Sequence, residues 1–282
     1  MNSMALILPL LMQVGPDPSS GAIPDYSAEV QDRPAREVQQ TPSEPVGDRV
    51  TPTWLEECFE LVDSDPARAH SQAQIRRDAS EGNERVLANH CFGLAATQLE
   101  RWDEARAAFV AARDGSPAED RAFRARVGAM AGNAAMPTGD MTGALALLDQ
   151  AESDARASTA RDMIGLVAVD KARVLVALER AEEAVPLLEE ATALRPTSGE
   201  APLLLATLYR RQDMLAEAQA AIDVALARDS QNPAIPLEAG VIAVLSGREA
   251  DARAQWQQVT ALAPDSAEAG TARGYLAQIG AE

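Results

Sequence analysis

Small and large apolar residues recur at a fixed interval along the C-terminal half of the chain. A small residue returns every 34 positions, and a large apolar residue follows it four positions later. The small members are Ala184, Ala218 and Ala252, and the large members are Leu188, Ile222 and Trp256. Spacings of three and four residues indicate a helix, and a step of this length accommodates two helices. The pattern therefore predicts a repeat of helix pairs.

The same order of residues extends upstream and ends in a proline that stops the second helix. The most complete unit is marked by Gly93, Ala105, Phe109, Ala112 and Pro117. This order resembles the tetratricopeptide repeat over about 80% of the chain. The intervals from Ala105 to Ala144 and from Ala144 to Ala184 are 39 and 40 residues, so we expect longer helices or loops there.

The resemblance implies an all-α fold. The expected fold is an α-solenoid, a right-handed superhelix of tetratricopeptide-like helix-turn-helix repeats, and we expect a disordered N-terminal segment before it. Small residues let paired helices approach, and large residues fill the space between successive pairs. We expect the solenoid over 53–282, with a degenerate unit at 53–80, units at about 86–118, 120–156, 160–197, 199–232 and 233–265, and a closing helix at 266–280.

Local signals predict several helix starts. The run from Ser116 to Glu119 has the spacing of a capping box with Pro117 at the first helical position. Asp140 and Asp213 stand where second helices should begin.

The N-terminus carries a candidate export signal. An apolar stretch from Met4 to Met12 precedes the small residues Ser20-Gly21-Ala22, which is typical of a signal peptide over 1–22. No Lys or Arg precedes the stretch and Pro9 interrupts it, so an unprocessed start is the alternative. Residues 23–52 are rich in Pro and Ser and predict a disordered linker. We expect a periplasmic or exported protein, with the cytoplasm as the alternative.

Charge and composition narrow the partner classes. The net charge of −18 argues against nucleic acid, and no apolar run is long enough to span a membrane. The chain is 46% hydrophobic but only 4% aromatic, which favours closely packed helices. Arg outnumbers Lys 24 to 1, which indicates a bacterial source with a high-GC genome.

All the cysteines and histidines lie between positions 58 and 91. Zinc is not expected, because His90 and Cys91 are neighbours on a helix and point about 100° apart. Cys58 and Cys91 fall on first helices of neighbouring units. They either form a disulfide or remain two buried thiols. No phosphate loop, dinucleotide fingerprint or nucleophile elbow is present, so we expect no enzyme, cofactor or metal.

The resemblance implies that four positions on each first helix line a groove for a partner. The expected groove residues are Leu87, His90, Leu94, Arg126, Asn133, Leu166, Val169, Arg173, Leu203 and Arg210, with Arg211 beside them. The four arginines could grip acidic groups or a C-terminal carboxylate of a protein or peptide. Alternatively they pair with acids of this chain, such as Asp170 and Asp213. The lysine–asparagine clamp of chaperone-binding members is absent, since only Asn133 is comparable and the single lysine is Lys171.

These observations predict a non-catalytic protein–protein interaction scaffold that binds a partner segment in its groove. The alternative is a structural or assembly-helper protein that acts through self-association in the bacterial envelope. The sequence leaves the partner's identity and the oligomeric state open.

Overall fold

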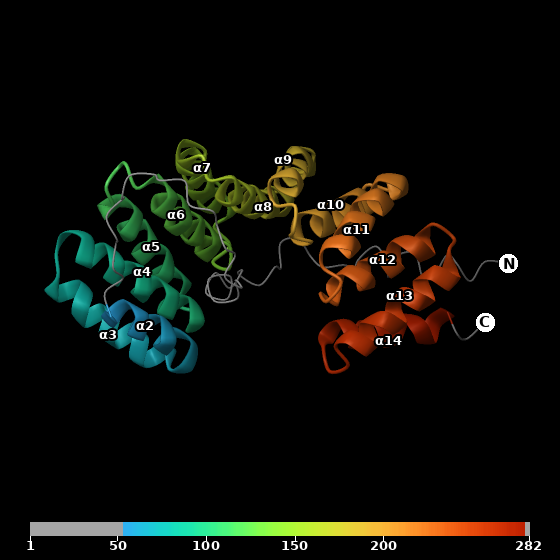
Figure 1. Cartoon of the computed structure of the whole chain (residues 1–282), viewed down its shortest axis with the longest axis horizontal. Coiled ribbons are helices and arrows are strands. Elements are labelled where there is room, and N and C mark those ends of the chain that lie inside the picture. The colour runs from blue at the N-terminus through green and yellow to red at the C-terminus, as the bar shows by residue number, and fades with distance from the viewer. Residues whose placement is uncertain (1–52, 280–282) are drawn as a thin grey trace, which may run out of the picture. The chain divides into compact units, whose positions relative to one another are not determined.

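The computed structural model of the chain describes residues 53–279, and this part contains thirteen α-helices and no strand (Figure 1). The predicted all-α fold is confirmed. The expected signal peptide and linker, residues 1–52, lie outside the described residues. The helices form two compact units, whose described residues are 53–159 and 160–279.

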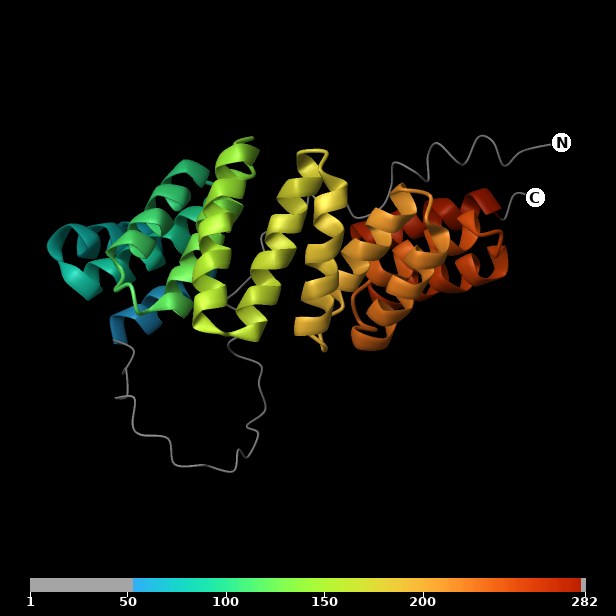
Figure 2. The ribbon, with the colours of Figure 1, turned by 90° about the horizontal axis from the view of Figure 1, so that it is seen from above.

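The first unit consists of three helix pairs, and consecutive helices lie side by side (Figures 1 and 2). The pairs are α2 (Thr53–Ser64) with α3 (Pro66–Ala79), α4 (Gly82–Gln98) with α5 (Trp102–Gly115), and α6 (Arg121–Ala135) with α7 (Met141–Ser158).

The second unit has three further pairs and a closing helix. The pairs are α8 (Arg161–Ala177) with α9 (Ala181–Leu194), α10 (Glu200–Arg211) with α11 (Leu215–Arg228), and α12 (Ala234–Leu245) with α13 (Glu249–Leu262); α14 (Ala267–Ile279) follows them. The interval from Ala144 to Ala184 is long because α7 has 18 residues and α8 has 17, against 14 in α9 and 12 in α10. The interval from Ala105 to Ala144 is long because α6 has 15 residues and a longer turn, 136–140, follows it.

Close approach of paired helices depends on the small residues of the repeat. A Cβ atom on Gly93 would lie 2.5 Å from the ring of Phe109, so only glycine fits there. The large apolar residues of the repeat are almost fully enclosed: Phe109, Leu148, Leu188, Ile222 and Trp256 are each at most 2% exposed. The small-and-large pattern thus sets the spacing of the helices.

The turns between paired helices have a left-handed residue in five of the six pairs. These residues are Glu100, Gly139, Glu179, Asp213 and Gly247, with φ from 56° to 82°. Asp140 caps α7 as expected, because its carboxylate accepts a hydrogen bond from the Gly143 amide at 2.9 Å. Asp213 does not start a helix; it occupies the left-handed turn, and α11 begins at Leu215.

The expected capping box at Ser116 is wrong. The Ser116 hydroxyl donates back to the Ala112 carbonyl oxygen at 2.7 Å and so ends α5 instead of starting the next helix. Residues 117–120 form a turn, and α6 begins at Arg121.

Candidate functional site

In the first unit, three aromatic rings follow one another across α2, α4 and α6. The His90 ring lies edge-on to Phe59 on one side and to Phe123 on the other, with centroid distances of 5.6 Å and 5.5 Å. We call Phe59, His90 and Phe123 the aromatic strip. Leu87 and Leu94 stand one helical turn before and after His90, and both are half-buried. The strip and its flanking leucines therefore form one apolar face.

His90 is the polar member of this face, and it is only 7% exposed. Its Nε2 atom is buried and has no hydrogen-bond partner among the described residues. Burial, assisted by the charge of Arg126, lowers the pKa of His90 from 6.5 to about 4. The imidazole is therefore neutral at pH 7 and keeps one unused polar atom.

Arg126 and Asn133 are the other expected groove residues of this unit, and both lie on α6. Arg126 is exposed and forms no ion pair with another described residue. Asn133 is 4% exposed and belongs to the interior of the unit. The structure thus brings Leu87, His90, Leu94 and Arg126 near one another, with Arg126 as the available charge.

The expected groove residues of the second unit are largely enclosed. Leu166, Val169 and Leu203 are at most 7% exposed, and Arg211 alone among the predicted positions of this unit is exposed. The Arg173 guanidinium donates to Asp170 at 3.1 Å and also to Glu200. Arg173 therefore has carboxylate partners within the chain, as the alternative interpretation expected for Asp170.

Arg210 is also paired, although with a different acid from the one suggested by the sequence. Its Nε atom lies 2.5 Å from the Glu238 carboxylate on α12, and both side chains are at most 1% exposed. Burial raises the pKa of Glu238, while the Arg210 charge and hydrogen bonds from Arg210 and Thr207 oppose that rise. Arg210 therefore has a carboxylate partner within the chain, as the alternative interpretation expected, although this partner is Glu238 and not Asp213.

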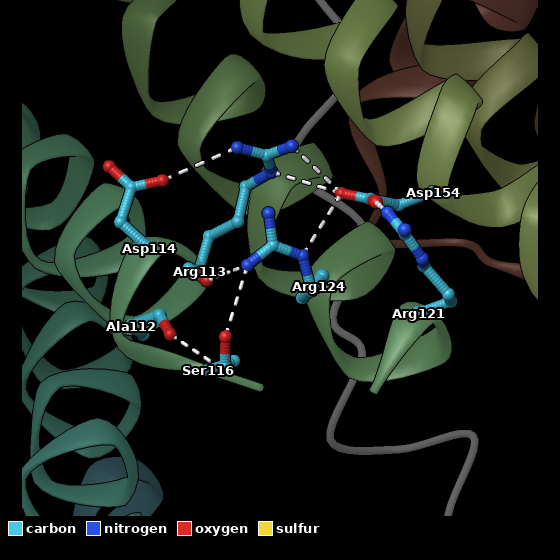
Figure 3. Close-up of polar contacts among 7 residues, drawn as sticks. All are labelled: Ala112, Arg113, Asp114, Ser116, Arg121, Arg124 and Asp154. Atoms are coloured by element: carbon cyan, nitrogen blue, oxygen red, sulfur yellow. Dashed lines mark hydrogen bonds and ion pairs between the residues drawn. The ribbon is translucent and has the colours of Figure 1, made fainter. Parts of the chain in front are cut away.

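A further polar cluster lies on α5, α6 and α7 and was not anticipated from the sequence (Figure 3). Arg113, Arg121 and Arg124 all approach the buried carboxylate of Asp154, with nitrogen–oxygen distances of 2.8, 2.8 and 3.6 Å. Burial acts to raise the pKa of Asp154, but hydrogen bonds from Arg121 and Arg113 outweigh it and hold that pKa below its usual value. Arg124 also donates to the carbonyl oxygens of Arg113 and Ser116.

The Asp154 cluster joins three helices and ends α5, which is a structural role. Spacing in the sequence does not predict this cluster, because Asp154 lies 33 residues from Arg121 and 41 residues from Arg113. The repeat itself was the available signal, since it places the end of α5 beside the next pair.

The two cysteines meet between α2 and α4. Their Cα atoms are 6.4 Å apart and their sulfur atoms are in disulfide contact. His70 pairs instead with Glu104, with Nε2 2.8 Å from the carboxylate oxygen. Within residues 53–279, no group of three or more His, Cys, Asp or Glu side chains is arranged to hold a metal. None of the described helices is both long and apolar enough to cross a membrane.

Comparisons with known proteins agree with this geometry. Residues 175–227 match the family model described as tetratricopeptide repeat. No curated protein sequence matches the chain.

Solved structures share the fold at low sequence identity. A MamA fragment from Desulfovibrio magneticus RS-1 has a TM-score of 0.52 and 18% identity, over 64% of this chain and 97% of that one. The apo form of the quorum sensor NprR from B. thuringiensis has a TM-score of 0.62 and 12% identity, over 79% and 67%. The TPR-like repeats of a putative kinesin light chain from Podospora anserina have a TM-score of 0.54 and 19% identity, over 67% and 100%.

Proposed function

We propose that this chain is a non-catalytic scaffold that binds a segment of another protein, because residues 175–227 match the tetratricopeptide-repeat model and solved structures of such repeats share its fold. The binding face is the aromatic strip of the first unit together with Leu87, Leu94 and Arg126. Helices that are already packed present this face, so binding requires little ordering of the scaffold and no cofactor.

The unused polar atom of His90 is the observation that carries the proposal. Buried polar groups usually have hydrogen-bond partners, and leaving one unpaired costs about 1–3 kcal/mol. Nε2 of His90 has no such partner among the described residues, and half-buried Phe59 and Phe123 stand on either side of it. A ligand that reaches this ring by a small shift of the phenylalanines could supply the missing hydrogen bond.

The exposed charge of Arg126 gives the chemistry expected of the partner segment. An apolar side chain would pack between Leu87, Leu94 and the phenylalanines, and a nearby carboxylate would pair with Arg126. The second unit contributes less to this proposal, because Arg173 and Arg210 already have acidic partners in the chain.

Selection from a peptide library displayed on phage, with the intact protein as bait, tests this proposal. Peptides selected on the native protein should combine an apolar anchor with an acidic residue. Leu94→Asp and Arg126→Glu should each weaken their binding about tenfold or more. Arg85→Glu is the matched control, since Arg85 is another exposed arginine of the same unit, on α4. Equal affinities for the Arg126→Glu and Arg85→Glu variants would contradict the assigned face.

Self-association in the bacterial envelope is the competing role, and light scattering during size-exclusion chromatography separates the two. A monomer that gains mass only when a selected peptide fused to a carrier protein is added supports the scaffold. A stable larger assembly of the protein alone supports self-association.

Export to the periplasm belongs to the proposal as well. An oxidising compartment suits a bridge between Cys58 and Cys91, which lie at a compatible distance. Sequencing the N-terminus of the natural protein tests the compartment: a start at Ile23 supports export, and an intact Met start contradicts it.

A further inference from the structure

A cavity of about 410 Å³ opens among α2, α3 and α4 at the start of the first unit. This volume is within the range of protein ligand pockets, about 300–1,000 Å³. The lining residues that bear on binding are Trp54 and Glu57 of α2, Ile75 and Arg76 of α3, and Glu84 of α4. Among the described residues that line the cavity, none belongs to the aromatic strip or to the Asp154 cluster. The cavity is therefore a surface separate from the face proposed above.

Ile75 gives this cavity an exposed apolar wall. Its side chain is 71% exposed, and residues 53–279 have one other exposed large apolar residue, Met214 at 38%. Trp54 is half-buried and lines the same cavity. Contact of apolar surface with water is unfavourable, so a ligand that covers both side chains gains free energy on binding. The cavity therefore suits an aliphatic side chain.

The charges on the wall leave one carboxylate unbalanced. The Arg76 guanidinium lies 4.3 Å from the Trp54 ring centroid and 2.6 Å from a Glu84 carboxylate oxygen. Arg76 therefore already contacts a ring face and a counter-charge. Glu57 is exposed and forms no ion pair with another described residue. A cation that enters beside the aliphatic group would pair with Glu57.

Acidic residues continue along α2 beyond the cavity. This helix carries four carboxylates and no basic residue. The four are Glu56, Glu57, Glu60 and Asp63; all are exposed, and none forms an ion pair with another described residue. Their combined potential attracts cations and favours a partner of positive charge. Glu60 lies one helical turn from Glu57, so a ligand with several basic groups meets a second acid there.

We propose that this cavity docks a basic segment of a partner protein. An aliphatic side chain of that segment packs against Ile75 and Trp54, and a neighbouring Lys or Arg pairs with Glu57. The row of acids on α2 favours a peptide over a small amine, because only a chain with further basic residues reaches past the cavity. The partner chemistry is opposite in charge to that proposed for Arg126, so neither assignment rests on the other.

A peptide array probed with the intact protein tests this assignment. Every peptide has the same Gly-Ser flanks and one of all possible pairs of residues at its centre. We expect the strongest binding where Leu, Ile or Val stands beside Lys or Arg. Binding no stronger than that of pairs in which Ser replaces the basic residue would overturn the inference. Binding confined to apolar–acidic pairs would also overturn it, yet would support the face at Arg126, so the two assignments fail separately.

Variants of the cavity wall locate the binding, measured by calorimetric titration of a soluble Leu-Arg peptide. Ile75→Ser should weaken its affinity about tenfold, and Glu57→Lys about fivefold. The matched controls are Gln74→Ser and Glu56→Lys, since Gln74 and Glu56 are exposed on α3 and α2 but do not line the cavity. Each control should change the affinity no more than about twofold. Equal losses in a variant and its control would contradict the assigned cavity.

Fluorine NMR gives a local readout, because the chain has three tryptophans and Trp54 alone among them lines the cavity. In protein labelled with 5-fluorotryptophan, the Trp54→Phe variant assigns the Trp54 signal. Addition of the Leu-Arg peptide should shift that signal and leave those of Trp102 and Trp256 in place. A bound peptide that shifts only the Trp102 or Trp256 signal would overturn the proposal.

Discussion

The two units use the same repeat positions for opposite purposes. On α4 of the first unit these positions hold half-buried leucines around His90, whose Nε2 has no described partner. In the second unit, Arg173 stands at the position equivalent to Leu94, and Arg210 occupies the last groove position of α10; both arginines bind carboxylates of the chain itself. Repeat position alone therefore does not make a side chain available to a partner. Availability depends on what the next helix pair supplies.

The acids that satisfy the second unit come from the following first helices. Glu200 on α10 reaches Arg173, and Glu238 on α12 reaches Arg210. The first unit has no comparable acid beside Arg126 among its described residues. The arginines at the groove positions of the second unit therefore have carboxylate partners within the chain, whereas Arg126 in the first unit has none among the described residues.

The largest effect on stability is expected when the Arg210–Glu238 ion pair of the second unit is broken. Glu238→Gln leaves the Arg210 guanidinium buried without a counter-charge, and breaking such a pair costs about 3–5 kcal/mol. Urea denaturation measures the loss, with Glu217→Gln as the control because Glu217 is an exposed glutamate on α11. Similar stabilities for the two variants would show that the stability of the second unit does not depend on the Arg210–Glu238 ion pair.

The two units also differ in their covalent structure, because both cysteines lie in the first unit. Replacing Cys58 and Cys91 together by alanine should lower the free energy of unfolding by about 2–4 kcal/mol, because a loop of this length is no longer closed in the unfolded chain. Amide hydrogen exchange should place the loss in residues 53–159.

Thiol titration of the denatured, unreduced protein checks the premise of that experiment. We expect no free thiols, and finding two would rule out the bridge. The matched variant is Cys58→Ala alone, which also breaks the bridge and should reproduce most of the loss.

Acid should weaken the first unit through His90. The pKa of this group is about 4 in the folded protein and 6.5 as the ordinary value, so the unfolded chain binds more protons between these limits. Stability is therefore complete above pH 6.5 and falls as the pH drops toward 4, by about 2 kcal/mol at pH 5.

His90→Phe should remove this pH dependence, because the variant has no imidazole to protonate. It should also raise stability by about 1 kcal/mol at pH 7, since the unpartnered nitrogen disappears among three phenylalanines. Denaturation curves at pH 7 and pH 5 test both points. A variant at His70, the other histidine, should keep the pH-dependent loss; if only the His70 variant abolishes it, the assignment to His90 is wrong.

The helix pairs and their packing were predictable, because they depend on spacing within one repeat. Gly93 and Phe109 meet within one pair, and the pattern of small and large residues announces that contact. Polar partners were not predictable in the same way. Arg210 selects Glu238 over the nearby Asp213 because the following helix brings Glu238 against it, and because Asp213 is held in a left-handed turn.

Local signals also failed where two interpretations shared the same residues. Ser116 has the sequence context of a helix start, yet its hydroxyl binds the last turn of the helix before it. A serine that follows one helix and precedes another can serve either, and only the geometry of the turn decides.

The smallest expected effect concerns the turns between paired helices, which have the same backbone conformation in both units although the groove side chains differ. Glu100 in the first unit and Glu179 in the second occupy equivalent left-handed turns, with φ of 56° and 61°. Glycine adopts this conformation without strain, although it loses more conformational entropy on folding than other residues do. Relief of the strain should outweigh this loss, so Glu100→Gly and Glu179→Gly should each add up to about 1 kcal/mol of stability. Alanine at either position should bring no gain, because it retains the Cβ atom that causes the strain. Urea denaturation of the four variants measures these effects, and a gain confined to one unit would mean that the turns, as well as the faces, have diverged.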